Sequence, residues 1–170
     1  MVSIEYFPVV NDQGDIIGKA TRSECHSGSF LLHPVVHLHV FNKSGELFLQ
    51  KRALDKDIQP GKWDTSVGGH VDFDEQIEHA LIREVNEELG IVDFVPKFIK
   101  RYKFVSDKEA ELVHSYYTIY DGPIQIDPIE ISEGKFWKIN DIENQIGKQV
   151  FTPNFEQEFK DVISTLTIIP

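Results

Sequence analysis

Three glutamates in one short segment have a spacing suited to metal binding. The segment runs from Gly69 to Ile91 and reads GHVDFDEQIEHALIREVNEELGI. Glu84, Glu87 and Glu88 follow an i, i+3, i+4 spacing, which places side chains together on one face of a helix. Like charges crowded in this way repel one another, so such carboxylates either take up protons or bind a cation. Hard divalent ions such as Mg²⁺ prefer oxygen ligands, and we interpret the three glutamates as a divalent-cation site.

The helix that should carry these glutamates is indicated by an apolar stripe with a period of about 100° per residue. We expect it over residues 75–89, with Glu84 and Glu88 inside the apolar arc and Glu87 at its edge. Carboxylates beside a buried stripe are better explained as cation ligands than as a solvated helix face. The stripe consists of Ile77, Ala80, Leu81, Val85 and Leu89.

The whole segment resembles the Nudix box at every defined position. Its order is Gly69, five residues, Glu75, seven residues, Arg83-Glu84-Val85, one residue, Glu87-Glu88, one residue and Gly90-Ile91. Gly90 suits the left-handed position that ends a helix, and Gly69 lets the backbone approach a ligand closely. The resemblance implies supporting roles for Glu75 and Arg83, which would orient the helix and its metal-binding carboxylates. A surface helix with a solvated glutamate face is the weaker alternative.

The resemblance also implies a fold, a reaction and a cofactor. The fold is α/β, a Nudix-type α/β/α sandwich with a mixed central sheet. The reaction is hydrolysis of a phosphoanhydride bond in a small-molecule diphosphate, of the type nucleoside diphosphate linked to a further group. The cofactor is Mg²⁺, with Mn²⁺ as a substitute, held by Glu84, Glu87 and Glu88 with the carbonyl of Gly69. Of these, Glu87 and Glu88 would be the catalytic residues.

Length, composition and charge indicate one domain with a small substrate. The chain has 170 residues, 41% of them hydrophobic, and we expect a single Nudix domain over 1–170. Residues 1–33 should form a hairpin and a short helical turn, 34–140 the core with the box at 69–91, and 141–170 the C-terminal helices. The net charge of −11 argues against nucleic acid or a membrane as a partner, whereas a homodimer stays open. With a single Cys25 and no targeting segment, we expect an inert buried thiol and a cytoplasmic location.

Hydrophobic patterning places the remaining elements around the box. Before the box we first expect a hairpin of strands 4–10 and 16–20, followed by a capping box at Thr21 and Glu24. A second hairpin of strands 35–41 and 46–52 should follow, and then a loop over 53–62 and a strand over 63–67. After it we expect antiparallel strands at 94–105 and 112–120, a strand at 135–139, a short helix capped by Asn140, and a last helix that begins at Thr152-Pro153. Its packing face should be Phe155, Phe159, Val162, Ile163 and Leu166.

Basic residues upstream of the box are candidates for phosphate binding. Lys51, Arg52, Lys56 and Lys62 lie on the strand and loop that precede it, and the alternative is a solvated basic edge. Trp63 could stack on a substrate group, although a tryptophan beside a strand is more often part of the core.

Four histidines fall outside these patterns. His37 and His39 alternate with apolar residues, so both point to one face, where they either line the site or face water. His79 and His114 have no comparable spacing and are expected to be ordinary surface or packing residues.

The segment 31–70, LLHPVVHLHVFNKSGELFLQKRALDKDIQPGKWDTSVGGH, is similar to type-I isopentenyl diphosphate isomerases, a Nudix branch with a non-hydrolytic activity. That branch uses a cysteine directly before the glycine-histidine pair, where this chain has Gly68. The thiol needed to protonate and deprotonate an allylic carbon is therefore absent. Because the chain also keeps every carboxylate of the hydrolytic box, we favour a hydrolase over an isomerase.

The isomerase resemblance also implies a second metal site, separate from the box carboxylates. Aligned residue by residue, His26, His33, His70, Glu109 and Glu111 fall on the five-ligand site of that branch. Such ligands would suit Zn²⁺ or Mn²⁺. Nudix hydrolases also commonly take a metal ligand or the general base from outside the box, so Glu111 is a further catalytic candidate. The alternative is a solvated hairpin tip at 108–111 with scattered surface histidines.

A third class is a Nudix-like domain that binds a nucleotide or sugar as a sensor without cleaving it. Such domains usually come fused to a DNA-binding module. No segment of this chain has the length or charge for one, so an enzyme is favoured.

Overall fold

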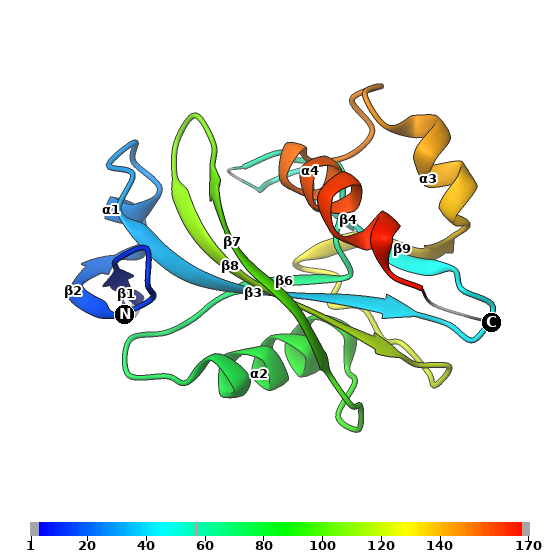
Figure 1. Cartoon of the computed structure of the whole chain (residues 1–170), viewed down its shortest axis with the longest axis horizontal. Coiled ribbons are helices and arrows are strands. Elements are labelled where there is room, and N and C mark those ends of the chain that lie inside the picture. The colour runs from blue at the N-terminus through cyan, green and yellow to red at the C-terminus, as the bar shows by residue number, and fades with distance from the viewer. Residues whose placement is uncertain (1–3, 57, 168–170) are drawn as a thin grey trace.

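A mixed β-sheet lies at the centre of the computed structural model, which describes residues 4–56 and 58–167 (Figure 1). Its strands are β3 (Leu32–Phe41), β4 (Leu47–Arg52), β5 (Trp63–Asp64), β6 (Val67–His70), β7 (Lys97–Val105), β8 (Ala110–Ile119) and β9 (Ile131–Trp137). They are ordered β5-β4-β3-β8-β7, with β6 also paired to β3 and β9 to β4. The β3–β8 pair is parallel, whereas β3 runs antiparallel to β6.

The two faces of β3 are buried by different helices because successive side chains of a strand point to opposite sides. Val36, Leu38 and Val40 pack with α2 (Ile77–Leu89) on one face. Phe41 packs with α4 (Pro153–Asp161) and α3 (Ile139–Gln145) on the other. Figure 1 shows α2 below the sheet and α3 and α4 above it, so the predicted α/β/α sandwich with a mixed sheet is confirmed.

The helix of the box has its predicted apolar stripe but starts later than expected. Gln76 is its N-cap and α2 begins at Ile77, whereas Glu75 lies in the preceding turn and accepts a hydrogen bond from the backbone N–H of Asp72 at 3.0 Å. The helix ends at Leu89, followed by Gly90 in the left-handed conformation with φ 64°, as predicted. Its buried apolar residues are Ala80, Leu81, Val85 and Leu89.

The N-terminal residues form a separate two-stranded sheet of β1 (Tyr6–Val10) and β2 (Ile16–Thr21). The capping box predicted at Thr21 and Glu24 is present and starts the short helix α1 (Arg22–Cys25). Cys25 is fully buried, and burial raises the pKa of its thiol to about 11, in keeping with inert packing. Through α1, this part of the chain brings His26 towards the main sheet.

Three predicted element boundaries were wrong. The single strand expected over 63–67 is divided into β5 and β6, because Ser66 uses its hydroxyl to bond the backbone of Val40 and Phe48 instead of continuing the ladder. The strand expected over 135–139 is β9, which starts at Ile131 and ends at Trp137. The short helix that follows is capped by Lys138 rather than Asn140, which lies inside its first turn.

The C-terminal elements agree better with the pattern. The strands β7 and β8 pair antiparallel as predicted, with starts at Lys97 and Ala110. Thr152 caps α4 by accepting a hydrogen bond from the N–H of Phe155 at 3.2 Å, and Pro153 is its first residue. Among the described residues, no helix is long and apolar enough to span a membrane.

Candidate active site

A cavity of about 500 Å³ lies where β3, β4, β6, β8 and the start of α4 converge. Strand β6 runs along its wall, so Gly68, Gly69 and His70 all border it. Two acidic residues from the start of β8 and its preceding turn, Glu109 and Glu111, border it as well. The glycine-histidine pair of the box and the late carboxylates therefore meet at one cavity.

Glu84 packs directly against the backbone of Gly69. A Cβ atom at Gly69 would overlap the Glu84 carboxyl group, so any other residue at this position would force Glu84 to move. The close approach places the Glu84 side chain against β6, on the helix side of the strand. The predicted need for glycine at the start of the box thus has a specific cause in the packing of its own carboxylate.

Glu88 is held by neutral donors rather than by a cation. Its Oε2 accepts a hydrogen bond from Gln50 Nε2 at 2.8 Å, and it also accepts from the backbone N–H of Gly68. The side chain is buried, with 8% of the residue exposed. Gln50 and Gly68 both border the cavity, so Glu88 lies one residue behind its wall.

Arg83 ties the box together through its guanidinium group. It binds both carboxylate oxygens of Glu75, at 2.9 and 2.8 Å, and donates to Glu84 at 2.8 Å and Glu87 at 3.2 Å. A further N–H donates to the carbonyl of His70 at 3.0 Å. Arg83 and Glu75 therefore connect α2 to the end of β6, which is the geometry expected of supporting residues.

Burial raises the pKa of two of the box carboxylates. Burial raises the pKa of Glu84 to about 7 although Arg83 acts to lower it, and burial together with Glu84 raises the pKa of Glu88 to about 8. Glu88 is buried, whereas the side chains of Glu84 and Glu87 are 14% and 56% exposed. A divalent cation would compensate the charge of the two less exposed carboxylates, Glu84 and Glu88.

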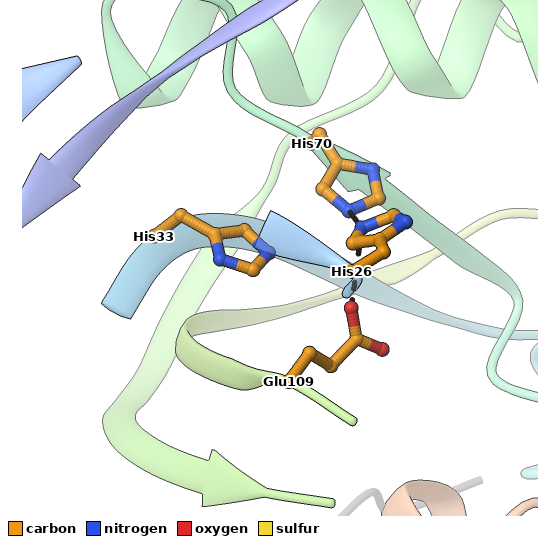
Figure 2. A group of neighbouring side chains, drawn as sticks. All are labelled: His26, His33, His70 and Glu109. Carbon is orange, nitrogen blue, oxygen red and sulfur yellow. Dashed lines mark hydrogen bonds and ion pairs between the residues drawn. The ribbon is translucent and has the colours of Figure 1, made fainter. Parts of the chain in front are cut away.

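Four of the five residues aligned with the isomerase metal site come together in the structure. One ligand atom from each of His26, His33, His70 and Glu109 lies within 4.8 Å of the others (Figure 2). His26 Nε2 lies 3.0 Å from His70 Nε2 and 3.1 Å from Glu109 Oε2. The residues come from four separate segments, so the cluster depends on tertiary packing.

Two features of this cluster would suit a metal ion. His33 Nδ1 donates to the Leu31 carbonyl at 2.9 Å, which leaves Nε2 buried without a hydrogen-bond partner among the described residues. Burial, with Arg22 and the neighbouring histidines, keeps the pKa of His70 well below its usual value, and burial also lowers that of His33. Neutral imidazoles with unused nitrogen atoms are the form that binds metals.

Glu111 lies at the same cavity but is engaged elsewhere. Its Oε2 accepts a hydrogen bond from Asn154 Nδ2 at 3.2 Å. Burial, followed by the charge of Glu109, raises the pKa of Glu111 to about 8. Glu111 borders the same cavity as Glu109 but is not one of the four members of the cluster.

The predicted phosphate-binding residues separate into two groups. Arg52 and Lys56 border the cavity. Lys51 instead lies 3.9 Å from Glu133, and Lys62 donates to the carbonyl of Gln149 at 2.6 Å. These two lysines are outside the cavity lining.

A substrate-stacking role for Trp63 is wrong. The residue is 7% exposed and its ring packs edge-on against Trp137, with centroids 5.2 Å apart, in the cluster under α4. Its position next to β4 directs the side chain away from the cavity into this core, so the core alternative holds.

Three polar residues at this site were not predicted: Gln50, Asn154 and Glu158. Gln50 follows three apolar residues in β4, and Glu158 lies between Phe155 and Phe159 on the buried face of α4. A polar residue within an apolar face was the signal available in both cases, and it is the same signal that identified the box glutamates. Asn154 had no comparable signal.

Comparison with known proteins agrees with this geometry. The model of the NUDIX domain matches residues 31–156. The chain belongs to the Nudix family. An isopentenyl-diphosphate Delta-isomerase 1 of Photorhabdus laumondii is 30% identical over 168 residues, 94% of this chain and 96% of the relative. A Nudix hydrolase of Pseudomonas aeruginosa, PA4841, is 32% identical over 133 residues, 75% of each chain.

Solved structures give the same assignment of fold. The Nudix fold of this chain is similar to that of DR0079 from Deinococcus radiodurans, with a TM-score of 0.80 and 21% identity over 92% of this chain and 98% of the other. Together with the hydrolase relatives, the complete box identifies the chain as a Nudix hydrolase. Enzymes of this kind cleave diphosphate bonds in small molecules and generally use divalent metal ions.

Replacing Gly69 with alanine should lower the free energy of unfolding by about 1–3 kcal/mol, because the new methyl group would force the Glu84 carboxyl group to move. The matched control is Gly68→Ala, where a Cβ would make only ordinary contacts, at 3.5 Å, with His37 and Thr65. This control should change the free energy by about 1 kcal/mol or less. Urea unfolding measures both, and equal losses would contradict the close packing of Glu84 on this Nudix glycine.

Proposed function

We propose that this Nudix hydrolase cleaves the phosphoanhydride bond of a nucleoside-diphosphate-linked or related diphosphate, with Mg²⁺ as cofactor and Mn²⁺ as a substitute. Glu84, Glu87 and Glu88 would hold the ion, with the Gly69 carbonyl as a further ligand. The observation that carries this proposal is the burial of Glu88 beside Glu84. Arg83 contacts Glu84 but not Glu88, which receives neutral donors, so an ionised Glu88 needs a further cation.

The protein residues around the box would prepare the site for this reaction. Gln50 orients Glu88, and Arg83 orients Glu84, each through a 2.8 Å hydrogen bond. Arg52 and Lys56 border the cavity and would contact phosphate oxygens of the substrate. When bound, the divalent ion supplies charge neutralisation of the diphosphate and a lowered pKa for a coordinated water.

Glu111 is our candidate for the group that takes up a proton. It borders the cavity, and Asn154 positions one of its oxygens. Its raised pKa, about 8 because of burial and Glu109, is in the range in which a carboxylate exchanges protons near neutral pH. Glu111, with Glu87 and Glu88, completes the proposed catalytic set.

Substitution of the catalytic glutamates by glutamine should abolish most of the activity while the fold is kept. In Glu88→Gln and Glu87→Gln, turnover should fall by orders of magnitude, because each variant loses a ligand that stabilises charge as it develops, at a cost of a few kcal/mol of barrier. A barrier increase of about 1.36 kcal/mol lowers the rate about tenfold. Glu111→Gln should also turn over slowly with saturating Mg²⁺. The assay is release of phosphate or monophosphate from a panel of diphosphates, with Mg²⁺ and with chelator.

The matched control for this assay is Glu78→Gln, which changes an exposed glutamate in the first turn of the same helix and should leave turnover unchanged. Full activity of Glu88→Gln in chelating buffer would disprove the metal-dependent mechanism. Wild-type turnover of Glu111→Gln would remove that residue from the catalytic set and leave the box alone.

A second candidate function is isomerisation of an isopentenyl-type diphosphate. It is favoured by the relative of that name, by the cluster of Figure 2 and by the neighbouring Glu111. It is opposed by Gly68, which borders the cavity and provides no thiol where the isomerase resemblance calls for one.

We therefore expect no interconversion of isopentenyl and dimethylallyl diphosphate by the purified protein. The measurement is conversion of isotopically labelled isopentenyl diphosphate by protein produced in a host that lacks its own isomerase. Because a thiol at position 68 is only one part of such a site, Gly68→Cys need not restore activity. Detectable isomerisation by the wild-type chain would favour the second candidate.

We also propose that His26, His33, His70 and Glu109 hold a second ion, Zn²⁺ or Mn²⁺, with Glu111 as a further ligand. Elemental analysis of the purified protein should then find about one transition-metal ion per chain. His33→Gln should lose it, because His33 Nε2 is the buried nitrogen without a hydrogen-bond partner. His79→Gln, an exposed histidine, is the control and should keep the ion. A metal-free wild-type protein that also takes up no added ion would exclude this site.

A further inference from the structure

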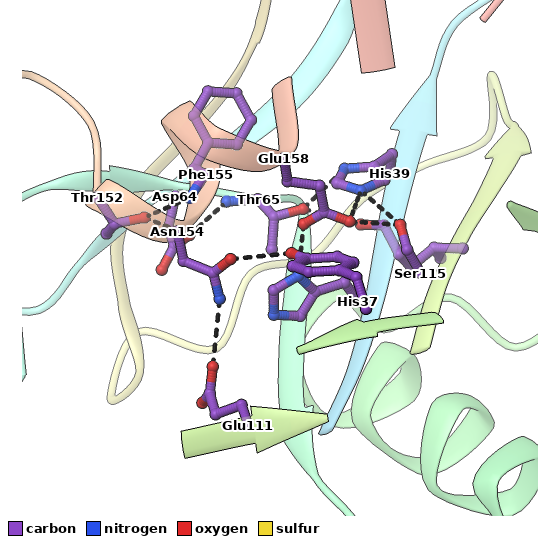
Figure 3. Close-up of polar contacts among 12 residues, drawn as sticks. His37, His39, Asp64, Thr65, Glu111, Ser115, Thr152, Asn154, Phe155 and Glu158 are labelled. Carbon is purple, nitrogen blue, oxygen red and sulfur yellow. Dashed lines mark hydrogen bonds and ion pairs between the residues drawn. The ribbon is translucent and has the colours of Figure 1, made fainter. Parts of the chain in front are cut away.

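A buried carboxylate on the α4 side of β3 contacts two histidines that face α4 rather than water. Glu158 of α4 is 1% exposed and lies 2.7 Å from His37 Nδ1 and 2.9 Å from His39 Nε2 (Figure 3). The hydroxyl of Ser115 also donates to it. His37 and His39 share a face as predicted, and that face is buried against α4.

The two histidines differ in what their second ring nitrogen contacts. His39 is fully buried, and its Nδ1 lies 2.9 Å from the Thr65 hydroxyl, so both of its nitrogens have partners inside the protein. His37 is 7% exposed and borders the cavity. Apart from Glu158, no hydrogen-bond partner of His37 is found within 4–56 and 58–167, so its Nε2 is unused.

Gly68 leaves the unused edge of His37 open. It pairs with His37 across β3 and β6, and a Cβ at Gly68 would lie 3.6 Å from His37 Nε2. Because glycine has no side chain there, an atom of a bound molecule can take that position. The nearby Glu111 does not fill it, since its carboxylate accepts from Asn154, whose own oxygen accepts from the Tyr102 hydroxyl at 2.9 Å.

Glu158 and His37 shift each other's pKa in opposite directions. Burial acts to raise the pKa of Glu158, but His39 and His37 hold it well below its usual value. Burial likewise acts to lower the pKa of His37, yet Glu158 raises it to about 9. With Glu158 ionised and Nδ1–H donating to it, the Nε2–H of an imidazolium at His37 faces the cavity.

We propose that His37 is a substrate-binding residue whose Nε2–H donates a hydrogen bond to an anionic phosphate oxygen, and that Glu158 is the residue that positions its ring. This assignment rests on the proposed function, because it takes the diphosphate as the ligand. The same cavity is bordered by Arg52 and Lys56, which suit the same anion. His39, bound to the same carboxylate but closed to the cavity, has only a structural role.

The test measures binding of methylenediphosphonate, a diphosphate analogue that cannot be hydrolysed. Its Kd is determined by calorimetry at pH 7 with Mg²⁺ and with chelator, for the wild type, His37→Gln and His39→Gln. His37→Gln should raise Kd about tenfold or more, the usual effect of losing a hydrogen bond to a charged group, whereas His39→Gln should leave it unchanged. Equal effects in both variants, or none in either, would overturn the assignment.

A second measurement needs only the wild-type fold and covers the case in which a variant does not fold. In long-range ¹H–¹⁵N spectra of histidine-labelled protein, addition of the diphosphonate should shift the Nε2 resonance of His37 and leave both nitrogens of His39 in place. Absence of this shift, or of any binding, would also contradict the assignment. If the shift appears but no diphosphate is cleaved by the enzyme, the hydrolase proposal fails while the assignment of His37 stands.

Discussion

The cost of burying negative charge is the constraint on which this site depends. An ionised carboxylate inside a protein is destabilising by several kcal/mol unless charge or hydrogen bonds compensate it. Two histidines contact Glu158, and Arg83 contacts Glu84 while also binding Glu75 and Glu87. Glu88 is surrounded by the amide of Gln50 and a backbone N–H. Because no cationic side chain among the described residues is bonded to Glu88, we propose a bound cation there.

Strand β6 lies between the box carboxylates of α2 and the His37–Glu158 pair, and its two glycines face opposite sides of the sheet. Because side chains alternate along a strand, Gly69 faces the helix α2 and Gly68 faces β3's histidine side. At Gly69 the missing side chain makes room for Glu84, and at Gly68 it leaves His37 open to the cavity. A Gly-Gly pair in one short strand therefore makes room for Glu84 on one face of the sheet and leaves His37 at the cavity on the other.

The parts of the fold that depend on local pattern were predictable, and the parts that depend on long-range packing were not. The apolar stripe of α2, the left-handed Gly90 and the Thr152 cap follow from neighbouring residues, so the sequence predicts them well. The division of strand 63–67 depends on Ser66 contacts with two other strands. The burial of Trp63 likewise depends on Trp137, far away in the chain.

The site shows the same division. The spacing of the box carboxylates indicated their proximity, and the apolar arc of the helix correctly placed Glu88 on its buried side and Glu87 at its edge. The donors that hold Glu88 could not be inferred, because Gln50 and Gly68 belong to other strands. The histidine cluster could be placed only by resemblance, since its members come from four separate segments. Glu158 lies 121 residues after His37 and 119 residues after His39, and no local sequence pattern indicates contacts over such separations.

An acidic protein can bind an anionic diphosphate because the two charges act over different distances. The net charge of −11 is spread over the surface, and at physiological salt its field decays within about 8 Å. Inside the cavity the substrate would meet Arg52, Lys56 and the imidazolium of His37 at close range, where screening by ions is weak. Since Glu158 stabilises the charge of His37 from inside the fold, this cation does not depend on solvent or on a surface partner. Under the proposed function, affinity for the anion would be decided by the cationic groups of the cavity lining, and the acidic surface would affect the rate of encounter.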